Sequence, residues 1–279
     1  MTIALDRTPA AGPGLAHYLR AAQVIIGREG LRFVHQRGRF ISALVRPLVW
    51  LFIFAAGFRA VLGVSIQPPY LTYVLYEVYI TPGLCGMILL FAGMQSSLAM
   101  VYDREMGSMR VLLVSPLPRA YVLCCKLLAG TLVAVVQVYV FLAIAYFWRI
   151  EPPMIGYLTV LPALLLAGLM LGSLGLLMSS LIRQLENFAG VMNFVIFPMF
   201  FASSALYPLW RVRESSYLLY QICTLNPFTH AVELIRFALY AQLNPEALLV
   251  VLGCTVLFLG GAIYGYDPGR GFLETKRGG

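Results

Sequence analysis

The sequence comprises 279 residues, of which 60% are hydrophobic and 11% charged, whereas a soluble domain carries about 25% charged residues. This composition excludes an ordinary soluble protein and predicts an integral membrane protein. The formal net charge of +8 also suits a nucleic-acid surface. However, fifteen of the twenty Lys and Arg residues gather in four segments separated by apolar runs, which membrane topology explains without a nucleic-acid partner.

Residues 1–42 are predicted to form a cytoplasmic arm with an amphipathic helix on the membrane surface. Apolar residues recur there at helical spacing and are followed by a basic stripe at similar spacing. A flexible basic arm is the alternative. Six arginines precede the first apolar run near Ile41, so nothing resembles a cleavable signal peptide. The apolar residues are Leu15, Leu19, Ala22 and Ile26, and the stripe is Arg28, Arg32, Gln36 and Arg39.

Six apolar runs within residues 43–266 reach the length of about 20 residues that a helix needs to cross the hydrocarbon core. They predict an all-α fold with six transmembrane helices, followed by a cytoplasmic tail at 267–279. An even number of crossings puts both termini on one side, and the basic bias makes this side the cytoplasm. The runs are Ala43 to Leu62, Ile80 to Met100, Tyr121 to Phe147, Ile155 to Ile182, Phe188 to Leu206 and Leu248 to Tyr266.

Charged residues are scarce in these spans. Arg46 and Lys126 are expected near the inner ends, and Arg59 and Glu77 near the outer ends. No Asp, Glu or Lys is expected at the midplane, where proton- or sodium-driven transporters place their relays. This pattern disfavours a secondary transporter.

The fourth span carries a face of small residues, Gly168, Gly172 and Gly175. Such a face lets another helix approach closely. The neighbouring helix can belong to the same chain or to a second copy, and packing within one chain is the simpler interpretation.

Aromatic residues cluster beside the second and fifth spans on the predicted outer side. Rings with one polar tip favour the headgroup level of a bilayer, so an interfacial belt is the preferred interpretation, and substrate contact is the alternative. The residues are Tyr70, Tyr73, Tyr76 and Tyr79, with Tyr207, Trp210, Tyr217 and Tyr220.

Residues 207–245 are predicted to be an outer re-entrant segment of short helices between the fifth and sixth spans. In "NPFTHAVELIR", Asn226 can cap a helix that begins with a proline. His230, Glu233 and Arg236 then follow at steps of three on one face. These four residues form either a polar cluster on an exit path or a capped helix that holds its charges in a local network.

A polar interruption, "DREMGSMRVLLVSPLPR", begins at Asp103 and supplies the predicted cytoplasmic loop 103–118. Gly107 allows a sharp turn, and Pro116 stops the short helix that follows. This helix presents Met109, Leu112 and Leu113 as an apolar patch. The patch can dock on a cytoplasmic partner or rest on lipid.

Motifs for covalent chemistry are absent from the sequence. It contains no GxxxxGK[ST] nucleotide loop, no HExxH and no GxGxxG, and its five cysteines include no CxxC pair. The chain is therefore predicted to be no enzyme and to hold neither a cofactor nor a metal. Energy for any work by this chain would then have to come from elsewhere.

Three stretches together resemble the type-2 permeases of ABC transporters, in the subgroup similar to the daunorubicin and nodulation-factor exporter permeases. They are "PGLCGMILL" entering the second span, the polar interruption with "KLLAG" after it, and "LNPFTHAVELIR" ahead of the sixth span. The resemblance implies that the segment around Glu105, Gly107 and Leu113 is a coupling helix that docks on a separate ATPase subunit, helped by the surface helix. It also implies two copies of this chain with two ATPase subunits, which bind the ATP and Mg.

The resulting hypothesis is the permease subunit of an exporter, which couples ATP hydrolysis in a partner to outward movement of a lipid, drug or glycan-type substrate. One alternative is an ATP-independent secondary transporter or channel, and another is an intramembrane enzyme that uses His230 and Glu233. Besides membrane lipid, the expected partners are the ATPase and a second copy of the chain. The expected coupling residues are Asp103, Arg104, Glu105, Gly107, Met109, Arg110, Leu112, Leu113 and Pro116.

Overall fold

A computed structural model describes residues 15–35, 37–58, 68–70, 75–106, 118–148, 150–182 and 184–266. Within these ranges the regular secondary structure is entirely helical, as predicted. The described helices are α1 (Leu15–His35), α2 (Arg37–Phe58), α3 (Tyr76–Glu105), α5 (Arg119–Phe147), α6 (Gly156–Leu181), α7 (Leu185–Phe201), α8 (Leu209–Ser215), α9 (Tyr217–Leu225), α10 (Pro227–Leu239) and α11 (Pro245–Gly265).

Four of the described helices, α3, α5, α6 and α11, are long and apolar enough to cross a membrane. The apolar parts of α2 and α7 are shorter, at Ala43–Ile53 and Leu185–Phe201. The fold is thus that of an integral membrane protein with four candidate spans in the described residues. The count of six spans stays a prediction, as does re-entry of the short helices α8, α9 and α10.

The longest helix, α3, extends beyond the apolar run that predicted it at both ends. It begins at Tyr76 and ends at Glu105, whereas the run extends only from Ile80 to Met100. Polar residues continue the helix because they find partners inside the protein. The hydroxyl of Tyr76, for example, donates a 2.7 Å hydrogen bond to the carbonyl oxygen of Leu206.

The small-residue face of α6 packs against α3 and α5 of the same chain. A Cβ atom on Gly93 of α3 would lie 2.9 Å from the Cα atom of Gly172. A Cβ atom on Gly175 would lie 2.6 Å from the Oγ atom of Ser97, and one on Gly168 would lie 2.7 Å from a methyl group of α5. Larger side chains would force these helices apart, so the glycines serve close packing within the subunit.

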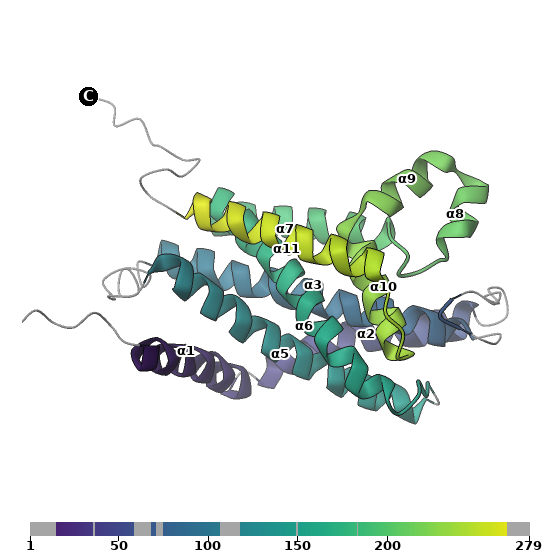
Figure 1. The fold of residues 1–279 in the computed structure, drawn as a ribbon, viewed down its shortest axis with the longest axis horizontal. Coiled ribbons are helices and arrows are strands. Elements are labelled where there is room, and N and C mark those ends of the chain that lie inside the picture. Colours follow the sequence, from purple (N-terminus) through teal and green to yellow (C-terminus); the bar gives the residue numbers. More distant parts are fainter. Residues whose placement is uncertain are drawn as a thin grey trace, which may run out of the picture.

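The two ends of α3 contact the two ends of the α7 region. At the start of α3, the Tyr79 hydroxyl donates to the carbonyl oxygen of Ser204 at 3.0 Å, just after α7. At the other end, Glu105 accepts a hydrogen bond from Leu185, the first residue of α7. The two helices are therefore antiparallel along their length. In Figure 1, α8, α9 and α10 gather at one end of the molecule, and α1 lies near the opposite end, where α11 finishes.

Three of the tyrosines predicted to form an interfacial belt lie inside the protein. Tyr70, Tyr76 and Tyr79 are at most 4% exposed, so the belt interpretation is wrong for them. Their burial follows from internal contacts, such as the edge-to-face packing of Tyr70 on Tyr240 with ring centroids 5.0 Å apart. Tyr217 on α9 is 62% exposed, and Tyr73 lies outside the described residues.

Arg46 also lies at a different depth from the one predicted. Its guanidinium sits 3.8 Å from the ring centroid of Phe91, which is fifteen residues after Tyr76 and fourteen before Glu105 in α3. The expectation that Arg46 lies near an inner end is therefore wrong, because α2 begins at Arg37, six residues before the apolar run. Lys126, in contrast, lies near the end of α3, as expected.

Candidate functional site

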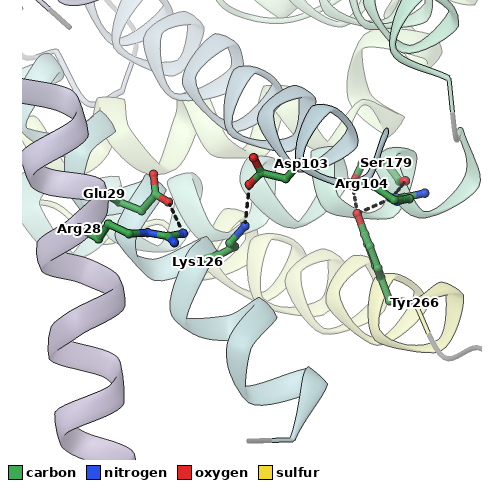
Figure 2. Close-up of polar contacts among 7 residues, drawn as sticks. All are labelled: Arg28, Glu29, Asp103, Arg104, Lys126, Ser179 and Tyr266. Carbon is green, nitrogen blue, oxygen red and sulfur yellow. Dashed lines mark hydrogen bonds and ion pairs between the residues drawn. The ribbon is translucent and has the colours of Figure 1, made fainter. Parts of the chain in front are cut away.

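Three consecutive charged residues end α3, and each contacts a different part of the bundle. Figure 2 shows the contacts of the first two, Asp103 and Arg104. Their contacts join α3 to α5, α6, α7 and α11. We call this set the α3 joint. It consists of Asp103, Arg104 and Glu105 with their partners Lys126, Ser179, Leu185 and Tyr266.

Asp103 forms an ion pair with Lys126 of α5, with 3.4 Å between the carboxylate oxygen and Nζ. The side chains are 16% and 7% exposed, respectively, so the lysine is held in a largely water-free position. Figure 2 also shows the exposed ion pair between Arg28 and Glu29, whose side chains extend from α1 toward Lys126. The pairing neutralises a buried charge and fixes the end of α3 to α5.

Arg104 joins α3 to both α6 and α11. Its guanidinium donates to the carbonyl oxygen of Ser179 at 2.6 Å and to the hydroxyl of Tyr266 at 2.9 Å. The hydroxyls of Ser179 and Tyr266 are themselves 2.8 Å apart. This closed network lets one side chain hold the C-terminal ends of two helices together.

Glu105 supplies a missing cap to α7. Its Oε1 atom accepts a 2.9 Å hydrogen bond from the backbone N–H of Leu185, while the preceding Gln184 makes no side-chain cap. The first N–H groups of a helix have no partner within the helix, and its N-terminus favours negative charge. Glu105 therefore satisfies both requirements from a neighbouring helix.

The remaining residues predicted for ATPase coupling lie outside the described residues. The structure thus places the beginning of the predicted coupling segment and leaves its apolar patch untested. The residues concerned are Gly107, Met109, Arg110, Leu112, Leu113 and Pro116.

At the opposite end, Asn226 caps α10 as predicted. Its side-chain oxygen accepts from the N–H of Phe228 at 3.0 Å, and Pro227 takes the first helical position. The side-chain nitrogen also donates to the carbonyl oxygens of Met199 and Ala202, at 2.7 and 2.6 Å. Asn226 consequently ties the start of α10 to the end of α7, a role that the capping pattern alone did not indicate.

Glu233 and Arg236 form an ion pair on α10. Arg236 is 1% exposed, donates to the carbonyl oxygen of Ser204 at 2.8 Å, and lies 4.2 Å from the ring centroid of Tyr79. Burial favours a lower pKa for Arg236, but the charge of Glu233 and the nearby tyrosines raise the pKa above its ordinary value. The guanidinium therefore stays charged and anchors α10 to the start of α3.

His230 makes a hydrogen bond of its own, separate from this ion pair. Its Nε2 atom donates to the carbonyl oxygen of Thr224 at 3.0 Å, and no described contact joins it to Glu233 or Arg236. The predicted outer cluster is thus a capping residue, an anchored ion pair and a separately bonded histidine. In the described part of the chain, no group of three or more His, Cys, Asp or Glu could hold a metal ion.

Comparison with known proteins identifies the family. A family model described as ABC-2 type transporter matches residues 20–240. Transport permease ycf38 of Cyanophora paradoxa is 27% identical over 224 residues, which cover 79% of this chain and 74% of the relative. The ycf38 permease of Porphyra purpurea is 24% identical over 225 residues, covering 78% and 74%. The multidrug ABC transporter permease YbhR of Escherichia coli K12 is 30% identical over 164 residues, which cover 58% of this chain and 43% of the relative.

The matched residues extend from α1 to the residue after α10 and include most of the α3 joint and all of the outer cluster. They also include the three stretches on which the sequence resemblance rested. The chain therefore belongs to the ABC-2 type transporter family and is a membrane-embedded transport permease.

Proposed function

We propose that this permease is the non-catalytic membrane subunit of an ABC exporter in an inner (cytoplasmic) membrane. Two copies assemble with two copies of a separate ATPase subunit, which binds ATP and Mg. The ATPases close around ATP, push on the coupling segment 103–118 and shift the helices as rigid bodies. A lipid, drug or glycan-type substrate then passes outward.

The α3 joint is the observation that carries this proposal. The coupling segment begins inside the joint, and the side chains of Asp103, Arg104 and Glu105 reach four other helices directly. A push that reaches Asp103, Arg104 and Glu105 is therefore transmitted directly to α5, α6, α7 and α11. A permease that is driven by a separate ATPase subunit needs such a connection.

Contacts along the bundle support six crossings with both termini in the cytoplasm. With its 22 residues, α2 is about 33 Å long, enough for the hydrocarbon core. With 17 residues, α7 reaches about 26 Å, and its contacts with both ends of α3 favour a crossing of the same thickness. On this topology α1, the α3 joint and the end of α11 face the cytoplasm.

The position of α1 supports a contribution to ATPase docking. The hydroxyl of Tyr121, at the start of α5, donates to the carbonyl oxygen of Tyr18 at 2.6 Å, and the two rings are 5.1 Å apart. Helix α1 is therefore held beside the start of α5, the helix that directly follows the coupling segment in the sequence. Its exposed Arg28–Glu29 pair offers charges to a partner on the same side.

A charge reversal at Glu105 tests the proposed docking. When a tagged permease is co-expressed with its ATPase, Glu105→Lys is expected to lower the recovery of the ATPase roughly tenfold, because repulsion at a docking surface weakens binding. Glu105→Gln keeps an oxygen that can accept from Leu185, so it removes the charge while preserving the cap on α7. The amount of ATPase recovered with each variant is measured from the rate of MgATP hydrolysis.

Glu246→Lys is the matched control, because this exposed residue begins α11 at the opposite end. Normal ATPase recovery with Glu105→Lys would contradict docking through Glu105. Loss with Lys but full recovery with Gln would limit Glu105 to its capping role. Movement of a fluorescent phospholipid in liposomes that contain the permease without any ATPase would instead support the secondary transporter or channel.

A further inference from the structure

A cavity of about 60 Å³ lies between α2, α3 and α5. Three polar side chains line it, Arg46 from α2, Gln95 from α3 and Gln137 from α5, and the other lining residues are mainly apolar. Phe91 lines it as well and marks its depth at the middle of α3. The cavity thus places a cation and two carboxamides far from either end of a spanning helix.

Gln137 is buried without a complete set of partners. The side chain is 6% exposed, and its Oε1 atom has no hydrogen-bond partner among the described residues. Buried carboxamides are normally satisfied, because an unpaired polar atom that has lost water is destabilising. The Oε1 atom itself is buried, but Gln137 lines the cavity, so a rotation of its carboxamide would present the unpaired oxygen to a group that enters the cavity.

Arg46 adds a charge to the same wall. Its described contact is with the ring of Phe91, and none of the described residues that line the cavity is acidic. Arginine within a membrane span is rare and marks substrate or ion pathways. The guanidinium has five donors in a planar fork that matches the oxygens of a phosphate or carboxylate. The cavity therefore has the charge and geometry to receive an anion.

We propose that this cavity binds the anionic headgroup of a membrane amphiphile, a phosphate flanked by hydroxyl groups. Arg46 binds the phosphate oxygens, the oxygen of Gln137 accepts from a neighbouring hydroxyl, and Gln95 supplies a further polar contact. The apolar walls formed by Met87 and Ile88 suit the adjoining part of a lipid rather than a hydrated free ion. This names a ligand class for the proposed exporter and depends on that proposal only for its role in transport.

Binding can be measured on the full-length permease without any ATPase. Purified in neutral detergent, the protein is titrated with short-chain phosphatidylglycerol, phosphatidylcholine or glycerol 1-phosphate, and bound molecules are counted by native mass spectrometry. Phosphatidylglycerol is expected to bind roughly tenfold more tightly than phosphatidylcholine. Both lipids carry a phosphate that can pair with Arg46, but phosphatidylcholine places a second cation, its choline, beside the guanidinium and has no headgroup hydroxyl to donate to Gln137. Free glycerol 1-phosphate is expected to bind much more weakly, and equal affinity would overturn the lipid assignment.

Substitutions locate the site. Arg46→Met is expected to abolish the tenfold preference, and Gln137→Glu to reverse it by placing a negative charge on the wall. Gln137→Leu, of similar volume, is expected to weaken phosphatidylglycerol binding several-fold. Arg213→Gln removes a charge from α8 at the outer end and is the matched control for general attraction between a basic protein and an anionic lipid.

An unchanged preference in Arg46→Met, or an equal loss in Arg213→Gln, would overturn the proposal. Thermal unfolding of each purified variant confirms that it is folded, and Gln137→Leu serves if Arg46→Met is not. Normal ATPase recovery with Glu105→Lys together with intact headgroup selectivity would contradict the proposed docking and leave this site standing. Lost selectivity with normal ATPase recovery would reject the site alone.

Discussion

The three charged residues that end α3 serve different purposes although they are adjacent in sequence. Asp103 neutralises a buried lysine, Arg104 joins two hydroxyl-bearing helix ends, and Glu105 caps another helix. Each contact satisfies a group that would otherwise be buried or left at a helix end without a partner. The functional demand for a firm connection and the structural demand for satisfied polar groups thus coincide.

The Asp103–Lys126 pair can be tested through its burial. Asp103→Asn leaves the Lys126 side chain, 7% exposed, without a negative partner, and is expected to lower the free energy of unfolding by about 1–3 kcal/mol. Thermal unfolding in detergent measures the change. The double variant Asp103→Asn with Lys126→Met is expected to recover part of the loss, because the unpaired charge is gone.

The exposed Arg28–Glu29 pair provides the comparison. Arg28 is 53% exposed on its side chain, so water screens its interaction, and Arg28→Gln is expected to change stability by less than about 1 kcal/mol. Equal losses in Asp103→Asn and Arg28→Gln would show that the buried pair contributes no more than a surface contact.

At the scale of helices, local signals in the sequence predicted more than long-range ones. The Asn-Pro start of α10 was confirmed because a cap and a first-turn proline act within a few residues. The extension of α3 beyond its apolar run and the contact of Arg46 with the middle of α3 were not predicted, because they depend on which residues of other helices lie opposite. Likewise, Asp103 to Glu105 were singled out as polar, but Arg104 finds Tyr266 across 162 positions, and no spacing rule indicates such a partner.

Close packing between α3 and α6 is a property of the helix pair that a single methyl group can probe. Gly93→Ala would bring a Cβ atom to 2.9 Å from the Cα of Gly172 and 3.0 Å from its nitrogen. Backbone atoms cannot rotate away, so the helices must separate, and we expect a loss of about 1–3 kcal/mol in stability. Gly253→Ala in α11 is the matched control, because nothing lies within 4 Å of its added methyl group.

The two variants separate packing from helix propensity. Alanine favours a helix over glycine by about 1 kcal/mol, so Gly253→Ala is expected to maintain or raise the melting temperature. A similar response of both variants would mean that the α3–α6 contact adjusts without strain, contrary to a rigid bundle.

At the scale of the whole molecule, α3 connects the two polar ends. Its final residues form the α3 joint. At its other end, Tyr79 in the first turn contacts Ser204 and the guanidinium of Arg236, which belongs to α10. Figure 1 shows the short helices α8, α9 and α10 at the end away from α1. A displacement at the joint therefore has a direct mechanical route to α10 and the helices beside it, provided that the coupling segment is stiff.

Insertion of Gly-Gly-Ser beside Gly107 tests that stiffness, since added flexible residues absorb a push. In the permease–ATPase complex, vanadate trapping with MgATP is expected to change amide hydrogen exchange in α8, α9 and α10 of the wild type. The insertion is expected to abolish this change while ATP hydrolysis continues. The same tripeptide placed between Glu151 and Pro152, in the loop after α5, controls for added length and should leave the response intact. A full response in the Gly107 insertion would mean that motion reaches the outer helices by a route other than the coupling segment.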